Sequence, residues 1–173
     1  MRVAKRFRWE AAHRLPWHDG LCKNNHGHSY ILEAAVDGAV DDRGMVLDFA
    51  VIKRALKPLV EAWDHATLVY EEDERYLAFV RDMDFKHYVL PYDTTAENLA
   101  RYAADRLLTE AADDLTACGA TSVSVRVYET ATAYAELVVP VAVPEAGDGA
   151  VAQAVFTPRP QPGPTEPPAL HDL

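Results

Sequence analysis

Alternating hydrophobic and polar residues predict β-strands at both ends of this chain. From Phe7 to His13, hydrophobic side chains and one histidine fall at every second position, and charged side chains occupy most positions between them. An extended chain places such residues on opposite faces, so one face is expected to be buried. The same alternation recurs in residues 28–36, 123–127 and 134–139. The last two segments are expected to pair as a hairpin.

Hydrophobic residues at helical spacing predict two long helices between these strand pairs. The first begins after Asp48, which fits an N-cap, and its apolar positions continue to Trp63. Pro58 lies inside it, and an interior proline costs about 3 kcal/mol, so we expect a kink or a split there. The second helix follows Thr94-Thr95-Ala96-Glu97, which fits a capping box, and ends at Gly119.

The remaining segments divide the chain into a domain and a tail. Residues 71–92 give no clear pattern beyond a short helix near residues 76–80. From Pro140 onward the composition changes, and eight of the eleven prolines lie there. We therefore expect one domain over residues 1–140 and an extended, flexible proline-rich tail over residues 141–173.

Composition and charge narrow the possible functions. The formal net charge of −10 argues against general binding to nucleic acid or to anionic membranes. A phosphorylated ligand would need a local cation. No apolar run is long enough to span a bilayer, and no export signal is evident, so a cytoplasmic location is expected. Two cysteines make no disulfide framework, which fits the same compartment.

Three histidines near the first strand pair predict a metal site. His26 and His28 flank Gly27, so both rings would project from one face of a strand. His13 lies on the segment that could pair with this strand and would add a third nitrogen. Three imidazoles leave the fourth position of a tetrahedral zinc ion free, as in catalytic sites. The alternative is three unrelated histidines, and His18 in the intervening loop is expected to be solvated.

Cys22, Asp64 and His65 are candidates for proton transfer. Cys22 lies in a polar loop beside Lys23 and near the predicted dication, and both charges would favour the thiolate. That thiolate is a possible base or a fourth zinc ligand. Asp64 and His65 are adjacent, and a carboxylate can orient an imidazole and stabilise its protonated form. If the fold brings the pair to Cys22, the three residues form a proton relay.

Glu129 is a candidate anchor for a heterocycle. Strand parity places it on the apolar face that Val127 shares, where a carboxylate is costly unless it is hydrogen-bonded. It could accept two parallel N–H bonds from a 2-amino-4-oxo pterin or a guanine ring. The alternative is that the strand ends at Tyr128 and Glu129 turns to water.

At these positions the sequence resembles the 6-pyruvoyltetrahydropterin synthase and 6-carboxytetrahydropterin synthase family, from about Phe7 to about Val139. The shared motifs are Glu10-Ala11-Ala12-His13, Cys22-x-x-x-His26-Gly27-His28, Met45-Val46-Leu47-Asp48-Phe49, Trp63-Asp64-His65, Thr95-Ala96-Glu97-Asn98 and Tyr128-Glu129-Thr130. The resemblance implies an α+β tunnelling fold of order ββ-αα-ββ, an antiparallel sheet with helices on one face. Such protomers form a trimeric barrel, commonly as a dimer of trimers, with active sites between subunits.

The resemblance also implies roles for single residues. The zinc ligands map onto His13, His26 and His28, and the catalytic residues onto Cys22, Asp64 and His65. The residues that bind the pterin map onto Glu129, Thr94 and Thr95. Residues 66–93 look longer than in compact bacterial members and could reshape the substrate mouth. The tail has no counterpart.

The implied activity is that of the carboxy-forming branch. Such a zinc-dependent carbon–carbon lyase converts 7,8-dihydroneopterin triphosphate to 6-carboxytetrahydropterin, releasing acetaldehyde and triphosphate, for queuosine-type 7-deazaguanine synthesis. One alternative is the pyruvoyl branch of tetrahydrobiopterin-type pathways, which eliminates triphosphate without that cleavage. The single loop cysteine and its compact spacing favour the first. A further alternative within the fold is cleavage of the pterin side chain in folate synthesis. Members proposed for that role often carry an acidic residue in place of the loop cysteine, so Cys22 argues against it. A non-catalytic, zinc-stabilised binding module is the alternative of another class.

Overall fold

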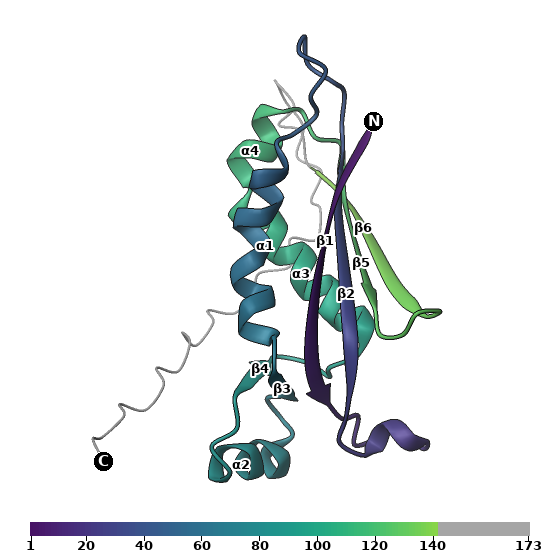
Figure 1. Ribbon diagram of the computed structural model, residues 1–173, viewed down its shortest axis with the longest axis vertical. Helices are drawn as coiled ribbons and strands as arrows, with labels where there is room; N and C mark the ends of the chain where they lie inside the picture. Colours follow the sequence, from purple (N-terminus) through teal and green to yellow (C-terminus); the bar gives the residue numbers. More distant parts are fainter. Residues whose placement is uncertain (142–173) are drawn as a thin grey trace, which may run out of the picture. The chain divides into compact units, whose positions relative to one another are not determined.

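Two long helices cover one face of a six-stranded sheet in the computed structural model (Figure 1). The structure describes residues 1–141, so the predicted tail lies outside the described residues. The strand order is β4-β3-β1-β2-β5-β6. None of the described helices is both long enough and apolar enough to cross a membrane.

The two strand pairs predicted from alternation are present. β1 (Arg2–His13) and β2 (His26–Asp37) pair antiparallel along their whole length, with His13 opposite His26 and Ala11 opposite His28. β5 (Ser122–Tyr128) and β6 (Tyr134–Pro140) form the predicted antiparallel hairpin, and β5 also pairs with β2. Residues directly opposite in such a ladder project to the same face, so the register decides which side chains meet.

Helix α1 (Phe49–Trp63) begins where the sequence predicts it. The Asp48 carboxylate accepts a hydrogen bond from the Ala50 backbone N–H at 2.7 Å. Pro58 lies inside a single continuous helix, so the helix is not split there. Pro58 is exposed. Water can therefore bind the carbonyl that lacks a partner, which makes the proline tolerable.

The second helical segment differs from its prediction in two details. α3 (Ala96–Glu110) is capped by Thr95, whose hydroxyl accepts from the Asn98 N–H at 3.3 Å, so the cap lies one residue later than the predicted capping box. The helix stops at Ala111, and a short α4 (Ala112–Ala117) follows. Gly119 then adopts a positive φ of 64° and ends the helical segment, as expected.

The segment between α1 and α3 forms a small parallel unit that the sequence patterns did not reveal. β3 (Ala66–Tyr70) and β4 (His87–Leu90) pair in parallel and are joined by α2 (Glu74–Asp82), which includes the predicted short helix. β3 also pairs in parallel with the end of β1 at Ala11 and Ala12. The sheet is therefore mixed rather than purely antiparallel. Strands of four and five residues are too short to show a clear alternation.

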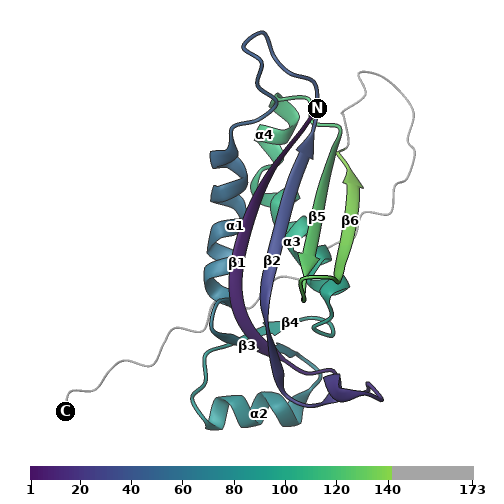
Figure 2. The same ribbon diagram turned by 45° about the vertical axis from the view of Figure 1, so that its right-hand side comes forward.

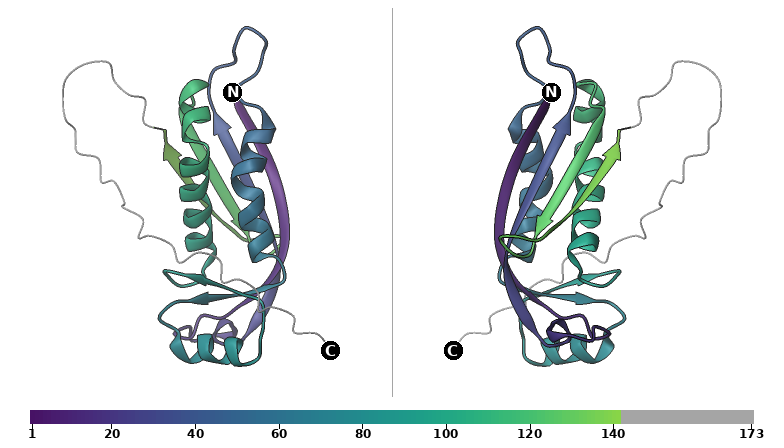
Figure 3. Two further views of the ribbon diagram at one scale, coloured as in Figure 1. Left: turned by 90° about the vertical axis from the view of Figure 1, so that its left-hand side faces the viewer. Right: turned by 90° about the vertical axis from the view of Figure 1, so that its right-hand side faces the viewer.

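The main core lies between the sheet and helices α1 and α3, which lie on the same face in every view (Figures 2 and 3). At its centre the Trp9 and Tyr30 rings stack with centroids 4.9 Å apart, and Trp63 of α1 packs against Trp9 at 5.5 Å. All three side chains are at most 2% exposed. The three histidines continue the Trp9–Tyr30 face of β1 and β2, so the core fixes the strands on which they lie.

Candidate metal centre

The register of β1 and β2 brings the three predicted histidines together. One ring nitrogen from each of His13, His26 and His28 lies within 4.8 Å of the other two. The centroids of the His13 and His26 rings are 4.6 Å apart. Gly27 allows this close approach of the strands, because a Cβ at this position would lie 3.0 Å from the Ala11 carbonyl oxygen. The prediction that the three rings converge is confirmed.

Backbone carbonyls orient two of the rings. His13 Nδ1 donates to the Thr94 carbonyl at 2.8 Å, and His26 Nδ1 donates to the Asn24 carbonyl at 2.8 Å. A carbonyl oxygen only accepts, so Nδ1 carries the proton in both rings and Nε2 has a free lone pair. Rings that ligate metals commonly donate their other N–H to such a group. The two rings are thus held in the tautomer that a cation requires.

Burial favours the neutral form of His13 and His28. His13 is 1% exposed, and its burial lowers its pKa from 6.5 to about 4. Burial also lowers the pKa of His28, and the neighbouring His26 adds to this effect. Neutral imidazole is the form that binds metal.

The donor set fits a divalent metal. His13 Nε2 is buried and has no hydrogen-bond partner among the described residues. An unpaired buried nitrogen costs free energy, and a metal bond would satisfy it. Three nitrogens around a tetrahedral zinc ion are roughly 3.3 Å apart, so small ring rotations would suffice from the present spacing. The site therefore fits a metal that keeps one position open.

Cys22 lies in the loop between the two histidine strands. It belongs to a short 3₁₀ helix, η1 (Leu21–Lys23), and is a half-buried free thiol. Its carbonyl accepts from the Leu15 N–H at 2.8 Å, which ties the loop across itself. The pKa of Tyr30 is raised by burial first and then by the nearby charges of Glu129 and Cys22. Cys22 and Glu129 therefore both lie near the buried ring that continues the histidine face.

Asp64 and His65 form a pair at the end of α1. His65 Nδ1 lies 2.9 Å from Asp64 Oδ2, and both side chains are open to solvent. The Glu10 N–H donates to Asp64 Oδ1 at 3.0 Å, and the pKa of Asp64 is lowered first by this bond and then by His65. No recorded contact within residues 1–141 joins this pair to Cys22. The relay that would join this pair to Cys22 therefore stays a prediction.

Glu129 combines the two alternatives that its position suggested. β5 ends at Tyr128, yet the Glu129 carboxylate stays half-buried, with Oε1 3.9 Å from His13 Nε2. Its burial raises its pKa, and the charge of Glu97 raises it further. The carboxylate thus faces the histidine cluster rather than open water, where it is available to a ligand.

The structure gives Thr94 and Thr95 local roles. Thr94 is 1% exposed, its carbonyl holds His13, and its hydroxyl lies 3.3 Å from His13 Nδ1. Thr95 caps α3. Contact of either with a substrate stays a prediction. The support that Thr94 gives to His13 was missed, since a carbonyl is present at every residue and carries no sequence signal.

Tyr30 is a second feature that the sequence did not flag. Its ring lies 5.4 Å from the His28 ring centroid and 6.0 Å from that of His13. Its hydroxyl is buried and has no hydrogen-bond partner among the described residues. Strand parity placed Tyr30 on the histidine face, but only the structure shows that its hydroxyl has no partner among the described residues.

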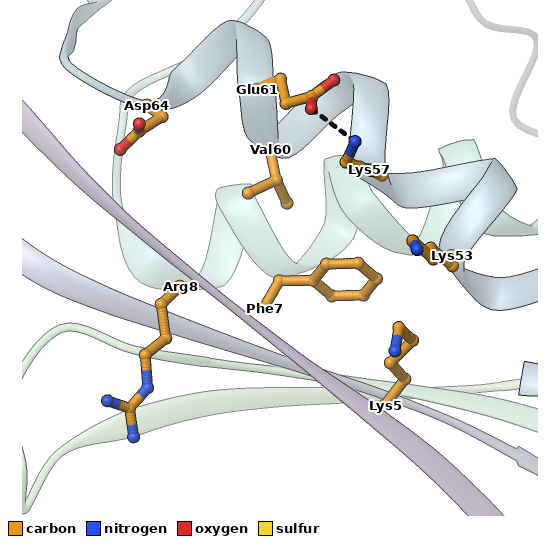
Figure 4. Close-up of a pocket in the computed structure, with 8 residues that line it drawn as sticks. All are labelled: Lys5, Phe7, Arg8, Lys53, Lys57, Val60, Glu61 and Asp64. Atoms are coloured by element: carbon orange, nitrogen blue, oxygen red, sulfur yellow. Dashed lines mark ion pairs between the residues drawn. The ribbon is translucent and has the colours of Figure 1, made fainter. Parts of the chain in front are cut away.

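A cationic groove lies apart from the histidines. It has a volume of about 280 Å³ and runs between β1 and α1, with Phe7 and Val60 among its lining residues (Figure 4). The lining cations are Lys5, Arg8, Lys53 and Lys57. Lys57 is paired with Glu61 at 2.8 Å. Asp64 also lines this groove, whereas none of the three histidines does. The groove is thus a separate surface that adjoins the Asp64–His65 pair.

Comparisons with known proteins agree with the resemblance seen in the motifs. The chain is 31% identical to a 6-carboxy-5,6,7,8-tetrahydropterin synthase of Haemophilus influenzae over 143 residues, covering 78% of this chain and 96% of that protein. It is 32% identical to the enzyme of the same name from Aquifex aeolicus over 157 residues, covering 78% of this chain and 95% of the relative.

Solved structures share the fold. The 6-pyruvoyl tetrahydropterin synthase of Plasmodium falciparum superposes with a TM-score of 0.66 at 20% identity, covering 81% of this chain and 98% of that one. The Caenorhabditis elegans protein of that name has a TM-score of 0.54 at 24% identity and covers 79% and 94%. The family described as 6-pyruvoyl tetrahydropterin synthase matches residues 2–139. Since that match spans nearly all of the described residues, this chain belongs to the 6-pyruvoyl tetrahydropterin synthase family.

Proposed function

We propose that this protein is a zinc-dependent 6-carboxy-5,6,7,8-tetrahydropterin synthase. It would convert 7,8-dihydroneopterin triphosphate and one water to 6-carboxytetrahydropterin, with release of acetaldehyde and triphosphate, and so serve 7-deazaguanine synthesis of the queuosine type. The observation that carries the proposal is the convergence of His13, His26 and His28, with an unpaired Nε2 on the buried His13. The names of the relatives at about 30% identity support the carboxy-forming branch.

The three histidines would hold the metal, and Glu129 would hold the substrate. When bound, zinc would supply Lewis acidity to the side-chain hydroxyls of the pterin. The Glu129 carboxylate would accept two parallel N–H bonds from the 2-amino-4-oxo edge of the ring. Its Oε1 lies 3.9 Å from His13 Nε2, which supports a site in which one substrate would reach both the carboxylate and the metal.

Cys22 and the Asp64–His65 pair would move the protons. As a thiolate, Cys22 would take a proton from the substrate side chain, and His65 would deliver one. Asp64 would hold the His65 ring through the 2.9 Å contact and stabilise its protonated form. Within residues 1–141 of one chain, no contact joins the pair to Cys22. We therefore propose that a second copy supplies Asp64 and His65, in a trimer or a dimer of trimers.

Product identification tests the proposal. The protein is incubated with 7,8-dihydroneopterin triphosphate, with and without chelator, and products are identified by mass spectrometry together with an acetaldehyde assay. We expect acetaldehyde and 6-carboxytetrahydropterin, both lost on chelation and restored by zinc. Triphosphate release without acetaldehyde would instead assign the pyruvoyl branch.

A matched variant separates an enzyme from a zinc-stabilised binding module. Cys22→Ala should keep the metal and the fold, because the half-buried thiol makes no side-chain hydrogen bond within the described residues. It should lose most of the rate, because the proposed base is removed. Cys118→Ala serves as the control, since that cysteine follows α4 and its thiol bonds the Leu115 carbonyl at 3.4 Å. Full activity of Cys22→Ala would remove Cys22 as the base.

A further inference from the structure

Helix α2 contacts both ends of the loop that joins the two histidine strands. This loop, residues 14–25, starts at Arg14, immediately after His13, and ends at Asn25, immediately before His26. It also carries Cys22. In the views of Figures 1 and 2, α2 lies beside the end of β1 and β2 from which this loop emerges. Residues of the α2 N-terminus thus adjoin the two ligand positions that face each other across the β1–β2 ladder.

At the first end of the loop, Arg14 forms a two-pronged ion pair with Asp73. Its Nε donates to Asp73 Oδ2 at 2.8 Å and its Nη2 to Oδ1 at 2.6 Å. The Asp73 side chain is only 9% exposed, and it also caps α2 by accepting from the Tyr76 N–H at 3.3 Å. The Arg14 guanidinium carbon lies 4.5 Å from the Tyr76 ring centroid. The Arg14 guanidinium therefore makes a bidentate ion pair with Asp73 along its edge and a cation–π contact with Tyr76 on its face.

At the second end of the loop, the same tyrosine holds Asn25. The Tyr76 hydroxyl donates to Asn25 Oδ1, and Tyr76 is 7% exposed. The preceding carbonyl, that of Asn24, accepts the Nδ1 proton of His26. The bond to Asn25 therefore lies between the carbonyl that orients His26 and the ring itself.

We propose that Tyr76 is a positioning residue for the metal centre, fixing the His13 and His26 ends of the loop relative to each other. This rests on the proposed metal site and not on the pterin reaction. Ligands held in place before binding lose less entropy when they bind, so such contacts raise metal affinity. Because α2 lies in the segment between α1 and α3, it gives that segment a task at the metal centre.

Tyr76→Phe tests the proposal, because it removes the hydroxyl and keeps the ring under Arg14. We expect zinc affinity to fall about tenfold, within the range for lost supporting contacts around a metal. Competition with a chromophoric chelator measures this, and the visible spectrum of the Co²⁺-loaded protein reports any change in ligand geometry. Tyr70→Phe is the matched control. Tyr70 lies on β3, its hydroxyl interacts with Glu72, and its substitution should change neither readout.

A double-mutant cycle identifies the contact responsible. Asn25→Ala should weaken zinc binding about as much as Tyr76→Phe, and the double variant should be no weaker than either single variant, because both remove one hydrogen bond. Additive losses would show that the two side chains act separately and would overturn the proposal. Wild-type affinity in Tyr76→Phe, with an unchanged Co²⁺ spectrum, would overturn it as well.

The outcomes also separate this inference from the proposed function. If the wild-type protein binds zinc and Tyr76→Phe binds it less tightly, the inference stands even when no pterin is turned over. If the wild-type protein turns over the pterin and Tyr76→Phe binds zinc normally, the inference fails alone. A wild-type protein that binds neither zinc nor Co²⁺ overturns both.

Discussion

The Nδ1–H groups of His13 and His26 donate hydrogen bonds to backbone carbonyls, which leaves the Nε2 lone pairs free for a metal. His28 completes the cluster from the same face of β2 as His26. Each ring therefore contributes one donor to a shared position, and the affinity for a cation depends on all three at once.

Removing one ring should show this dependence. His28→Ala should lower zinc affinity by more than the roughly 10–100-fold typical of losing a supporting contact, because a direct ligand is lost. His18→Ala is the control, since His18 lies in the loop outside the cluster and its ring accepts from the Gly20 N–H at 2.8 Å. Equilibrium dialysis with metal analysis measures both variants. Equal affinities for His28→Ala and the wild type would contradict the assignment of this ligand.

Protonation of His13 should make the metal-free protein sensitive to acid. The pKa of His13 is about 4 in the folded chain and 6.5 ordinarily, so the unfolded chain binds the proton first as the pH falls. Stability should thus be lost between pH 6.5 and about 4, by roughly 3 kcal/mol. Urea unfolding of chelator-treated protein at several pH values checks this. In His13→Gln the loss should be smaller; an identical pH profile would rule out His13 as its source.

At the scale of elements, one exposed proline lies inside the continuous helix α1. Pro58 donates no backbone hydrogen bond, yet the helix continues through it from Phe49 to Trp63. Pro58→Ala should restore one intrahelical bond and raise the free energy of unfolding by about 1–3 kcal/mol. Chemical denaturation measures the change. Lys53→Ala, at another exposed α1 position, should stay within about 0.5 kcal/mol of the wild type. An unchanged or lower stability of Pro58→Ala would show that the helix geometry is adapted to proline.

The sequence predicts the elements whose patterns are long and regular. Strands β1 and β2 have twelve residues each, and α1 presents seven buried positions at helical spacing. Patterns of this length indicate in the sequence alone which face is buried. β3 and β4 are short and pair in parallel with strands distant in sequence, which no local pattern records. The Thr95 cap was misplaced by one residue because Thr94 offers the same hydroxyl.

The candidate site divides in the same way. The convergence of His13, His26 and His28 follows from strand parity and spacing, and these residues could be named from the sequence. Contacts made through backbone carbonyls, or across long separations such as Tyr76 to Asn25, could not. They depend on which distant segments meet in the fold, and the local hydrophobic and polar pattern does not record that.

At the scale of the whole molecule, the sheet leaves unpaired edges within the described residues. β6 ends the sheet on one side, and β1 has β3 as a neighbour only at Ala11 and Ala12. Exposed edges of this length are normally covered or paired. Pairing with further copies of the chain would cover them, in keeping with the proposed oligomer.

Mixing two inactive variants tests whether the site is shared between copies. Cys22→Ala and His65→Ala chains, carrying different tags and produced together, should form mixed oligomers in which some sites keep both residues. We expect activity in the doubly purified oligomer that neither variant shows alone. A mixed oligomer as inactive as its parents would contradict a site built from two chains. For the proposed trimer or dimer of trimers, light scattering should give a mass three or six times that of the 19.2 kDa chain.

The pairing of His13 opposite His26 ties ion capture to strand alignment. A slip of one residue between these strands would send the His26 and His28 rings to the far side of the sheet and leave His13 alone. An ion that needs all three nitrogens would thus not bind a hairpin misaligned in this way. Zinc supplied during refolding would stabilise the correctly aligned hairpin and so enrich that alignment before the helices pack against it.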